Sequence, residues 1–400
     1  MPTDRTPCAD ERTDSSIAAE DRTTVHSEST RDDSPRGLPT RRQFFGAVGA
    51  TGIGLTAGCT SSITGGSSDE TITVGYQQFG TPYWSELLVK NGELAEEYLP
   101  DGYSVEWQTA LQGSVIGNRM VSGENEIGYN GDMPTIMAII NEDTPISMTG
   151  LSAWSWGQQC NLVITPTDRD FDGPQDLDGM NVGITTGSCT HRFWLDVEER
   201  EGISAEITDT DINTILAEIR EGNLDAGLMW EPNPSMAVTQ QEEANWFFTG
   251  ARYNDPDMGS VSMTDEFIEE NEDAAIAYMK AELEAKHIFE DDQERAVELI
   301  GEEPDLEDYD AETIEASIYE PIDANEEEVN KMEFATDMRQ IEPIDVHIKE
   351  TAANFLVDQG EIERAPEEDD FNWDILDAAI EELEDEGVDW DPTDEEVTTE

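Results

Sequence analysis

Short apolar runs alternate with longer amphipathic stretches from Thr71 onward, and this alternation restricts the fold more than any other feature of the chain. The first series predicts strands at residues 71–76, 104–109, 126–129 and 146–151, and helices at 83–98, 114–121 and 133–140. Strands that alternate with helices form βα units, which pair mainly in parallel and carry helices on the sheet faces. The sequence therefore predicts an α/β fold with mixed, mainly parallel sheets.

A second series of the same kind begins near Cys160. It predicts strands at 161–165, 181–185, 205–208, 225–230 and 245–249, and helices at 189–200 and 212–221. Beyond Asp265 the strand pattern is no longer found, and helices are predicted at 266–289, 292–300, 311–318, 326–339, 346–359 and 372–384. Two α/β series followed by helices indicate two lobes with a helical C-terminal extension, a division that also fits a chain of 400 residues. Residues 391–400 form an acidic tail.

The charge balance is extreme, with 93 acidic against 21 basic residues and a formal net charge of −72. Nucleic acid is an improbable partner, because the chain has no basic field to displace counterions from phosphates. The acidic residues lie between well-patterned segments, so they indicate an acidic surface and not a disordered chain. In molar salt the screening length is about 3 Å, which removes most of the self-repulsion. We therefore expect a salt-requiring protein from an extreme halophile.

The first 58 residues predict an export signal that is removed from the mature protein. Residues 1–40 lack apolar periodicity and predict a disordered leader. The segment TRRQFF at 40–45 resembles the twin-arginine export motif, and the apolar stretch that follows at 46–57 is too short to span a bilayer permanently. The segment TAGC at 56–59 resembles a lipobox, although Leu55 lies one place too far from the cysteine. This resemblance implies lipidation of Cys59, with a flexible tether over residues 59–69.

Ligands of open α/β sheets bind outside the carboxyl ends of the strands, where loops and helix N-termini present backbone N–H groups. Four such ends combine a Gly or Pro with polar and aromatic side chains. They are GYQQFG at 75–80, GYNGDMP at 128–134, GSCTH at 187–191 and WEP at 230–232. The sequence therefore places the candidate site in these four loops.

In this order and spacing, four segments resemble the nitrate/sulfonate/taurine group of solute-binding proteins of ATP-driven importers. They are GYNGDMP at 128–134, DLDGMNVG at 176–183, GSCTH at 187–191 and GNLDAGLMWEP at 222–232. The resemblance runs from about residue 71 to about 359. It implies a two-lobed periplasmic-binding-protein type II fold, related to that of thiamine-pyrimidine binding proteins, which closes on a ligand by hinge motion. Lobe 1 would comprise residues 70–155 and 251–390, and lobe 2 residues 156–250.

The implied function is capture of a small polar or anionic solute and its delivery to a permease with an ATPase subunit. The protein would be a monomer, anchored through Cys59 to the outer face of the cell membrane, with no cofactor and no catalysis. The candidate ligand-binding residues lie in the four loops, with neighbouring aromatic residues. They are Gln77, Gln78, Phe79, Tyr83, Asn130, Gly131, Asp132, Trp154, Trp156, Gly187, Ser188, Cys189, His191, Trp230 and Glu231.

Several alternatives stay open on the sequence. Asp132 and Glu231 either cap helices or face the ligand, and in the second case an ammonium or a zwitterion such as an aminosulfonate becomes a better candidate. Aromatic residues with an acid would also suit a quaternary amine. Cys160 and Cys189 are candidates for a disulfide, which export would permit.

Other functions also remain open. The solute can instead be a thiamine-precursor pyrimidine, bicarbonate or an amine, and the chain can instead be the receptor module of a sensor. The alternative of a different class is an exported enzyme that uses Cys189 and His191. Residues two apart on a helix do not face one another, which disfavours that pairing. No cluster of side chains has metal-ligand spacing.

Overall fold

The structure, a computed structural model, describes residues 70–322, 324, 333–334 and 342–388. All of them belong to one compact unit, Gly65–Glu400. The proposed leader, Cys59, the tether and the acidic tail at 391–400 lie outside the described residues. Within the described ranges, no helix is both long and apolar enough to cross a membrane.

The first sheet has six strands in the order β11-β4-β10-β3-β1-β2. Their bounds are β1 (Glu70–Tyr76), β2 (Tyr103–Thr109), β3 (Ile127–Gly131), β4 (Ile146–Ser155), β10 (Asp257–Thr264) and β11 (Glu333–Phe334). Strand β1 pairs in parallel with β2 and β3, whereas β10 is antiparallel to both β3 and β4. The chain thus returns from the second sheet to the middle of the first.

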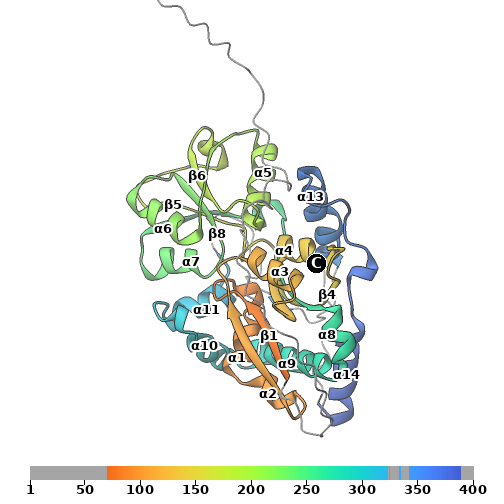
Figure 1. Cartoon of the computed structure of the whole chain (residues 1–400). Helices are drawn as coiled ribbons and strands as arrows, with labels where there is room; N and C mark the ends of the chain where they lie inside the picture. Colours follow the sequence, from red (N-terminus) through yellow and green to blue (C-terminus); the bar gives the residue numbers. More distant parts are fainter. Residues whose placement is uncertain (1–69, 323, 325–332, 335–341, 389–400) are drawn as a thin grey trace, which may run out of the picture. The chain divides into compact units, whose positions relative to one another are not determined.

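The second sheet has five strands in the order β7-β6-β8-β5-β9. Their bounds are β5 (Leu162–Pro166), β6 (Asn181–Ile184), β7 (Glu206–Asp209), β8 (Ala226–Met229) and β9 (Ala244–Thr249). Strand β6 pairs in parallel with β7 and β8, and β5 is antiparallel to β8 and β9. Figure 1 shows β5, β6 and β8 grouped with α5 and α6, apart from β1 and β4. Each sheet has its own buried apolar clusters.

Helices flank both sheets. Their bounds are α1 (Ser85–Asn91), α2 (Leu94–Tyr98), α3 (Gly113–Val121), α4 (Asp132–Ile139), α5 (Cys189–Glu201), α6 (Ile212–Glu221), α7 (Asn233–Ser235), α8 (Asp265–Glu270), α9 (Glu272–Asp291), α10 (Gln293–Gly301), α11 (Ala311–Tyr319), α12 (Glu342–Val346), α13 (Ala353–Gln359) and α14 (Asp374–Glu386). Helix α9 packs against α1, α2 and α14. The C-terminal helices therefore complete the half of the molecule that the first sheet begins (Figure 1).

The sequence prediction differs from the structure at several elements. The sheets are mixed, as predicted, but not mainly parallel, because β4, β5, β9, β10 and β11 all pair antiparallel. The helix predicted at 83–98 is divided into α1 and α2, where Glu93 adopts φ 55°. Most of the helix predicted at 326–339 lies outside the described residues, and the described part forms strand β11.

Strand β10, like β11, was not predicted as a strand. All eight of its residues are buried, and it lies between β3 and β4. Polar and apolar residues alternate from Ser260 to Thr264, so the sequence holds a strand signal that was not used. At Gly259 a larger residue would collide with a neighbouring backbone segment. A Cβ atom on Gly259 would lie 2.2 Å from the carbonyl oxygen of Pro82. Gly259 therefore permits the turn Thr81–Tyr83, which positions Tyr83, to lie directly against the sheet.

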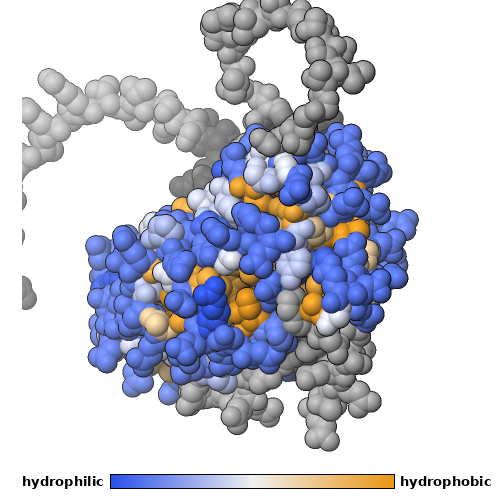
Figure 2. Space-filling view, turned by 90° about the horizontal axis from the view of Figure 1, so that it is seen from below, coloured by the Kyte–Doolittle hydropathy of each residue, from blue (hydrophilic) through white to orange (hydrophobic). Residues whose placement is uncertain are grey.

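The acidic residues follow the exposed faces of the helices, as in α14, where Glu381, Glu382 and Asp385 are exposed and Leu383 is buried. Figure 2 shows one face of the molecule, on which hydrophilic residues cover most of the described surface and apolar residues gather in limited patches. This distribution fits the expectation of an acidic, solvated surface.

Candidate functional site

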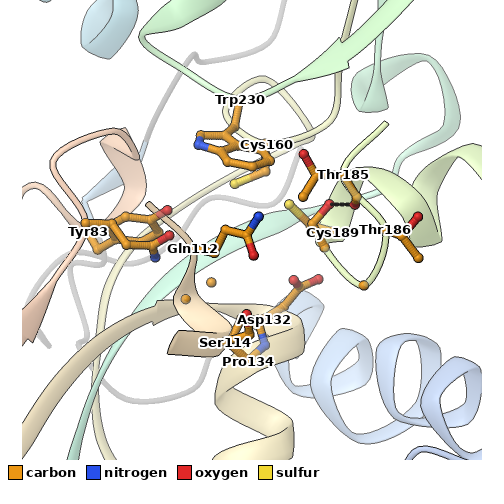
Figure 3. A pocket seen from close by; sticks show the side chains of 15 residues that line it. Tyr83, Gln112, Ser114, Asp132, Pro134, Cys160, Thr185, Thr186, Cys189 and Trp230 are labelled. Atoms are coloured by element: carbon orange, nitrogen blue, oxygen red, sulfur yellow. Dashed lines mark hydrogen bonds between the residues drawn. The ribbon is translucent and has the colours of Figure 1, made fainter. Parts of the chain in front are cut away.

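A pocket lies at the carboxyl ends of strands from both sheets. Its free space is about 510 Å³ when the region open to solvent is included, which is the size of a small-molecule site. The described residues that line it are Gln77, Tyr83, Gln112, Gly113, Ser114, Gly131, Asp132, Pro134, Cys160, Thr185, Thr186, Gly187, Ser188, Cys189 and Trp230. Figure 3 shows Tyr83, Trp230, Cys189 and Asp132 around this space.

The wall on the side of the first sheet consists of three loops that follow β1, β2 and β3. Gln77 follows β1, and its backbone N–H donates to the buried Glu86 carboxylate at 3.2 Å. Gln112 precedes α3, and Asp132 opens α4 directly after β3. Polar groups from three neighbouring strand ends therefore converge on one space, as expected at this edge of an α/β sheet.

The wall on the side of the second sheet is the loop between β6 and α5. Gly187 adopts φ +84°, a conformation that glycine takes at little cost. Ser188 occupies the N-cap position of α5, and its hydroxyl donates to the Thr185 carbonyl at 2.7 Å and not to the helix backbone. The first turn of a helix has N–H groups without intrahelical acceptors and carries the positive end of the helix dipole. This wall can therefore bind an oxyanion without a cationic side chain.

Two aromatic side chains close the pocket between the walls. The indole N–H of Trp230, after β8, donates to the backbone oxygen of Phe79 at 3.0 Å, so it links the two sheets. Burial raises the pKa of the Tyr83 phenol, which therefore keeps its proton and stays a hydrogen-bond donor. Rigid aromatic faces with one polar atom suit the apolar part of a small ligand.

Asp132 carries the one formal charge among the described lining residues. Its Oδ1 accepts from the backbone N–H of Met133 at 2.7 Å, and its Oδ2 lies 2.7 Å from His347 Nε2 and 3.8 Å from Arg192 Nε. Burial alone would raise the pKa of Asp132, but the hydrogen bond from His347 and the charge of Arg192 outweigh it and lower the pKa. Asp132 is therefore a stable carboxylate.

Arg192 connects this carboxylate to the segment that leads into β10. Its guanidinium donates two hydrogen bonds to Asp255, at 3.0 and 2.9 Å, and is 3% exposed. Burial would lower the pKa of Arg192, but the carboxylates of Asp255 and Asp132 raise it, so the cation persists. A buried chain of charged and polar groups thus runs from His347 through Asp132 and Arg192 to Asp255, behind the pocket.

Eight of the fifteen predicted ligand-binding residues lie in the pocket lining. They are Gln77, Tyr83, Gly131, Asp132, Gly187, Ser188, Cys189 and Trp230. Their contact with a ligand remains a prediction. The prediction of a site at strand carboxyl ends identified these residues because all of them except Tyr83 lie at the end of a strand, in the loop after it or at the start of the following helix.

Four predicted residues lie outside the lining because they hold the surrounding structure. Phe79 contributes its backbone oxygen to Trp230, and the side-chain oxygen of Gln78 accepts from Thr109. Asn130 is fully buried within β3. Glu231 accepts hydrogen bonds from the N–H and hydroxyl of Ser235, at 3.2 and 2.7 Å, so it acts at the start of α7 and not in the pocket.

The remaining three predicted residues lie away from the pocket. Trp154 and Trp156 pack edge to face, with ring centroids 5.4 Å apart, in the cluster that includes Phe371. His191 is partly buried on α5 and does not line the pocket. Its Nδ1 accepts from the N–H of Gly187 at 3.4 Å, and its ring contacts Phe355. The hydrophobic periodicity of the sequence predicts which side chains are buried. It does not predict which of the buried side chains border a cavity.

The sequence analysis missed several lining residues. Gln112, Gly113 and Ser114 follow strand β2, and Thr185 and Thr186 follow β6. Pro134 is the last residue of the loop segment GYNGDMP. These residues would have been predicted if the loop after the carboxyl end of every parallel strand had been included in the candidate site. Cys160, expected only as a disulfide partner, precedes an antiparallel strand, so no such signal marks it.

Cys160 and Cys189 are free thiols that share the pocket. Their mutual hydrogen bond and the burial of Cys160 raise the pKa of its thiol. We expect a small-molecule disulfide to oxidise this pair to a bond between the two sulfur atoms, with the two protons and two electrons passing to the reagent, which is reduced to two thiols. Peptide mapping by mass spectrometry would detect the cross-link. Cys189→Ser should form none, and persistence of two reactive thiols after oxidation would contradict the expectation.

No known family's sequence profile matches the chain. A curated relative, the taurine-binding periplasmic protein of Escherichia coli K12, is 25% identical over 225 residues, which cover 54% of this chain. The match spans 66% of that relative's length, slightly less than two thirds.

Two solved structures share the fold. The periplasmic aliphatic sulphonate binding protein SsuA from Escherichia coli superposes with a TM-score of 0.59 at 17% identity, over 76% of this chain and 92% of that one. The periplasmic nitrate-binding protein NrtA from Synechocystis PCC 6803 gives 0.59 at 14% identity, over 81% and 91%. The fold is therefore that of the periplasmic binding proteins.

Proposed function

We propose that this chain, which has the periplasmic-binding-protein fold and is similar in sequence to a taurine-binding protein, is the solute-binding component of an ATP-driven importer. It binds a small sulfonate or a related oxyanion between its two sheets and delivers it to a permease and its ATPase. The observation that carries the proposal is the α5 N-terminus, which faces the pocket beside the hydroxyl of Ser188 and those of Thr185 and Thr186.

Ligand capture proceeds by closure of the two halves. The chain crosses between the sheets after β4 and after β9, and the two crossings provide a hinge. Two hydrogen bonds join the halves beside the pocket: Trp230 to Phe79, at 3.0 Å, and Tyr309 to Asn233, at 2.9 Å. A ligand that contacts both walls stabilises this closed arrangement, because it gains its full set of contacts only there.

The expected cellular context follows from the N-terminal residues. Twin-arginine export and lipidation of Cys59 place the protein outside the cell membrane as a membrane-anchored monomer. Binding without chemical transformation is favoured over an enzyme that uses Cys189 and His191. The reason is that His191 Nδ1 accepts from Gly187 and its ring packs against Phe355, away from the pocket lining.

A thermal-shift screen in multimolar KCl tests the function against sulfonates, nitrate, bicarbonate, pyrimidines and quaternary amines. A sulfonate present at one hundred times its dissociation constant adds about 2.7 kcal/mol to the free energy of unfolding. Ser188→Glu introduces a carboxylate at the α5 N-terminus, and we expect it to abolish that gain by repelling the anion. The matched control is Ser204→Glu, at an exposed position beyond the C-terminal end of α5, which should keep the gain in stability. Stabilisation by pyrimidines or amines, and by no oxyanion, would overturn the proposal.

A further inference from the structure

The charge of the pocket depends on one residue. Asp132 is the only described lining residue with a formal charge, and it is 2% exposed. Figure 3 shows its carboxylate at the edge of the space that Gln112 and Cys189 border. A ligand that carries an ammonium group would therefore have Asp132 as its counterion, provided that the carboxylate is free to accept it.

The carboxylate is already engaged by groups behind the pocket. His347 Nε2 lies 2.7 Å from Oδ2, and because an ionised carboxylate only accepts hydrogen bonds, Nε2 carries the proton. Arg192 Nε faces the same oxygen at 3.8 Å, and Met133 N–H donates to the other oxygen at 2.7 Å. His347 is 1% exposed and Arg192 3% exposed, so solvent screens neither contact strongly.

We propose that His347 is a positioning residue that makes the pocket select unsubstituted alkanesulfonates over aminoalkanesulfonates. This inference rests on the proposed function, because it concerns the same pocket. His347 and Arg192 both engage Oδ2 of Asp132, and neither of them lines the pocket, so they compensate the carboxylate from behind. The ammonium of a zwitterion would lose its water without gaining a full counterion, which is costly in a buried site. An alkyl chain has no charge to desolvate, and it can pack against Trp230, Tyr83 and Pro134.

Taurine and 1-propanesulfonate are a matched pair of probes, because they differ only in an ammonium against a methyl group at one end. We expect calorimetry in multimolar KCl to give a dissociation constant at least about tenfold larger for taurine. Tighter binding of taurine to the unmodified protein would overturn the inference while leaving the proposed function intact. Absence of binding by any oxyanion would overturn both.

Variants separate the charge effect from structural damage, because a ratio of two dissociation constants cancels losses common to both ligands. His347→Leu removes the donor, frees Oδ2 for the ammonium, and should lower the taurine-to-propanesulfonate ratio by about tenfold. His347→Gln retains an N–H donor and should keep the ratio within about threefold of the original. His287→Leu, on α9 and paired with Asp291, is the control and should leave the ratio unchanged.

A double variant identifies Asp132 as the group through which His347 acts. In an Asp132→Asn background the counterion is gone, so His347→Leu should no longer change the ratio. A ratio that His347→Leu leaves unchanged in the original protein would overturn the inference. If His347→Leu changed the ratio as much in the Asp132→Asn background as in the original protein, the inference would also be overturned.

Discussion

Replacing Arg192 with leucine is expected to remove about 3–5 kcal/mol from the free energy of unfolding, because it leaves buried carboxylates without their cation. Arg192 and Asp255 are 3% and 4% exposed, and two hydrogen bonds join them. Asp132 loses a neighbouring positive charge in the same variant. Chemical denaturation in multimolar KCl, with the midpoint and slope both recorded, measures the loss.

A surface ion pair provides the control for this variant. Arg295 and Glu298 lie 3.5 Å apart, with side chains that are 47% and 66% exposed. Arg295→Leu should therefore change stability by less than about 1 kcal/mol, and less still in strong salt. If Arg192→Leu cost no more than Arg295→Leu, the contacts of Arg192 with Asp255 and Asp132 would not contribute to stability as expected.

Replacing Glu282 with glutamine is expected to remove about 3 kcal/mol of pH dependence from folding stability. Glu282 lies on α9 in the core of the first half, fully buried, where the Tyr129 hydroxyl donates to it. Burial raises its pKa from 4.5 to about 7. Glutamine keeps an acceptor for Tyr129 and carries no charge at any pH.

The direction of the effect follows from the raised pKa. Below pH 4.5 the carboxyl is protonated in the folded and the unfolded chain, and its contribution to stability is complete. As pH rises toward 7, the unfolded chain loses the proton first, so stability falls. Unfolding free energies at pH 5 and pH 8 should therefore differ less in Glu282→Gln than in the original protein.

The exposed Glu294 on α10 provides the comparison for Glu282. Glu294→Gln should leave the difference between pH 5 and pH 8 unchanged, because this side chain stays in contact with water when the chain folds. Burial also raises the pKa of Glu86 and brings that of Asp257 to about 6, so Glu282→Gln leaves part of the pH dependence in place. An unchanged pH dependence in Glu282→Gln would contradict the assignment.

The sequence predicted most of the strands and the loops that line the pocket. Strands such as β1 and β6 are marked by local apolar runs, and Gly131 and Gly187 lie directly after predicted strands. These signals are local, because a strand end and the loop after it are consecutive in the chain. The order of two such series was sufficient to predict a two-lobed α/β fold, which the likeness to periplasmic binding proteins confirms.

The sequence by itself thus determined most of the secondary structure of the two halves and the composition of the binding loops, because both depend on near neighbours. Only the tertiary structure decided the rest. Strand β10 has a local alternation of polar and apolar residues, but its place between β3 and β4 depends on pairing with segments far earlier in the chain. His347 contacts Asp132 across 215 positions, and Arg192 reaches Asp255 across 63. Such pairs form where the fold brings distant segments together, and no local spacing encodes them.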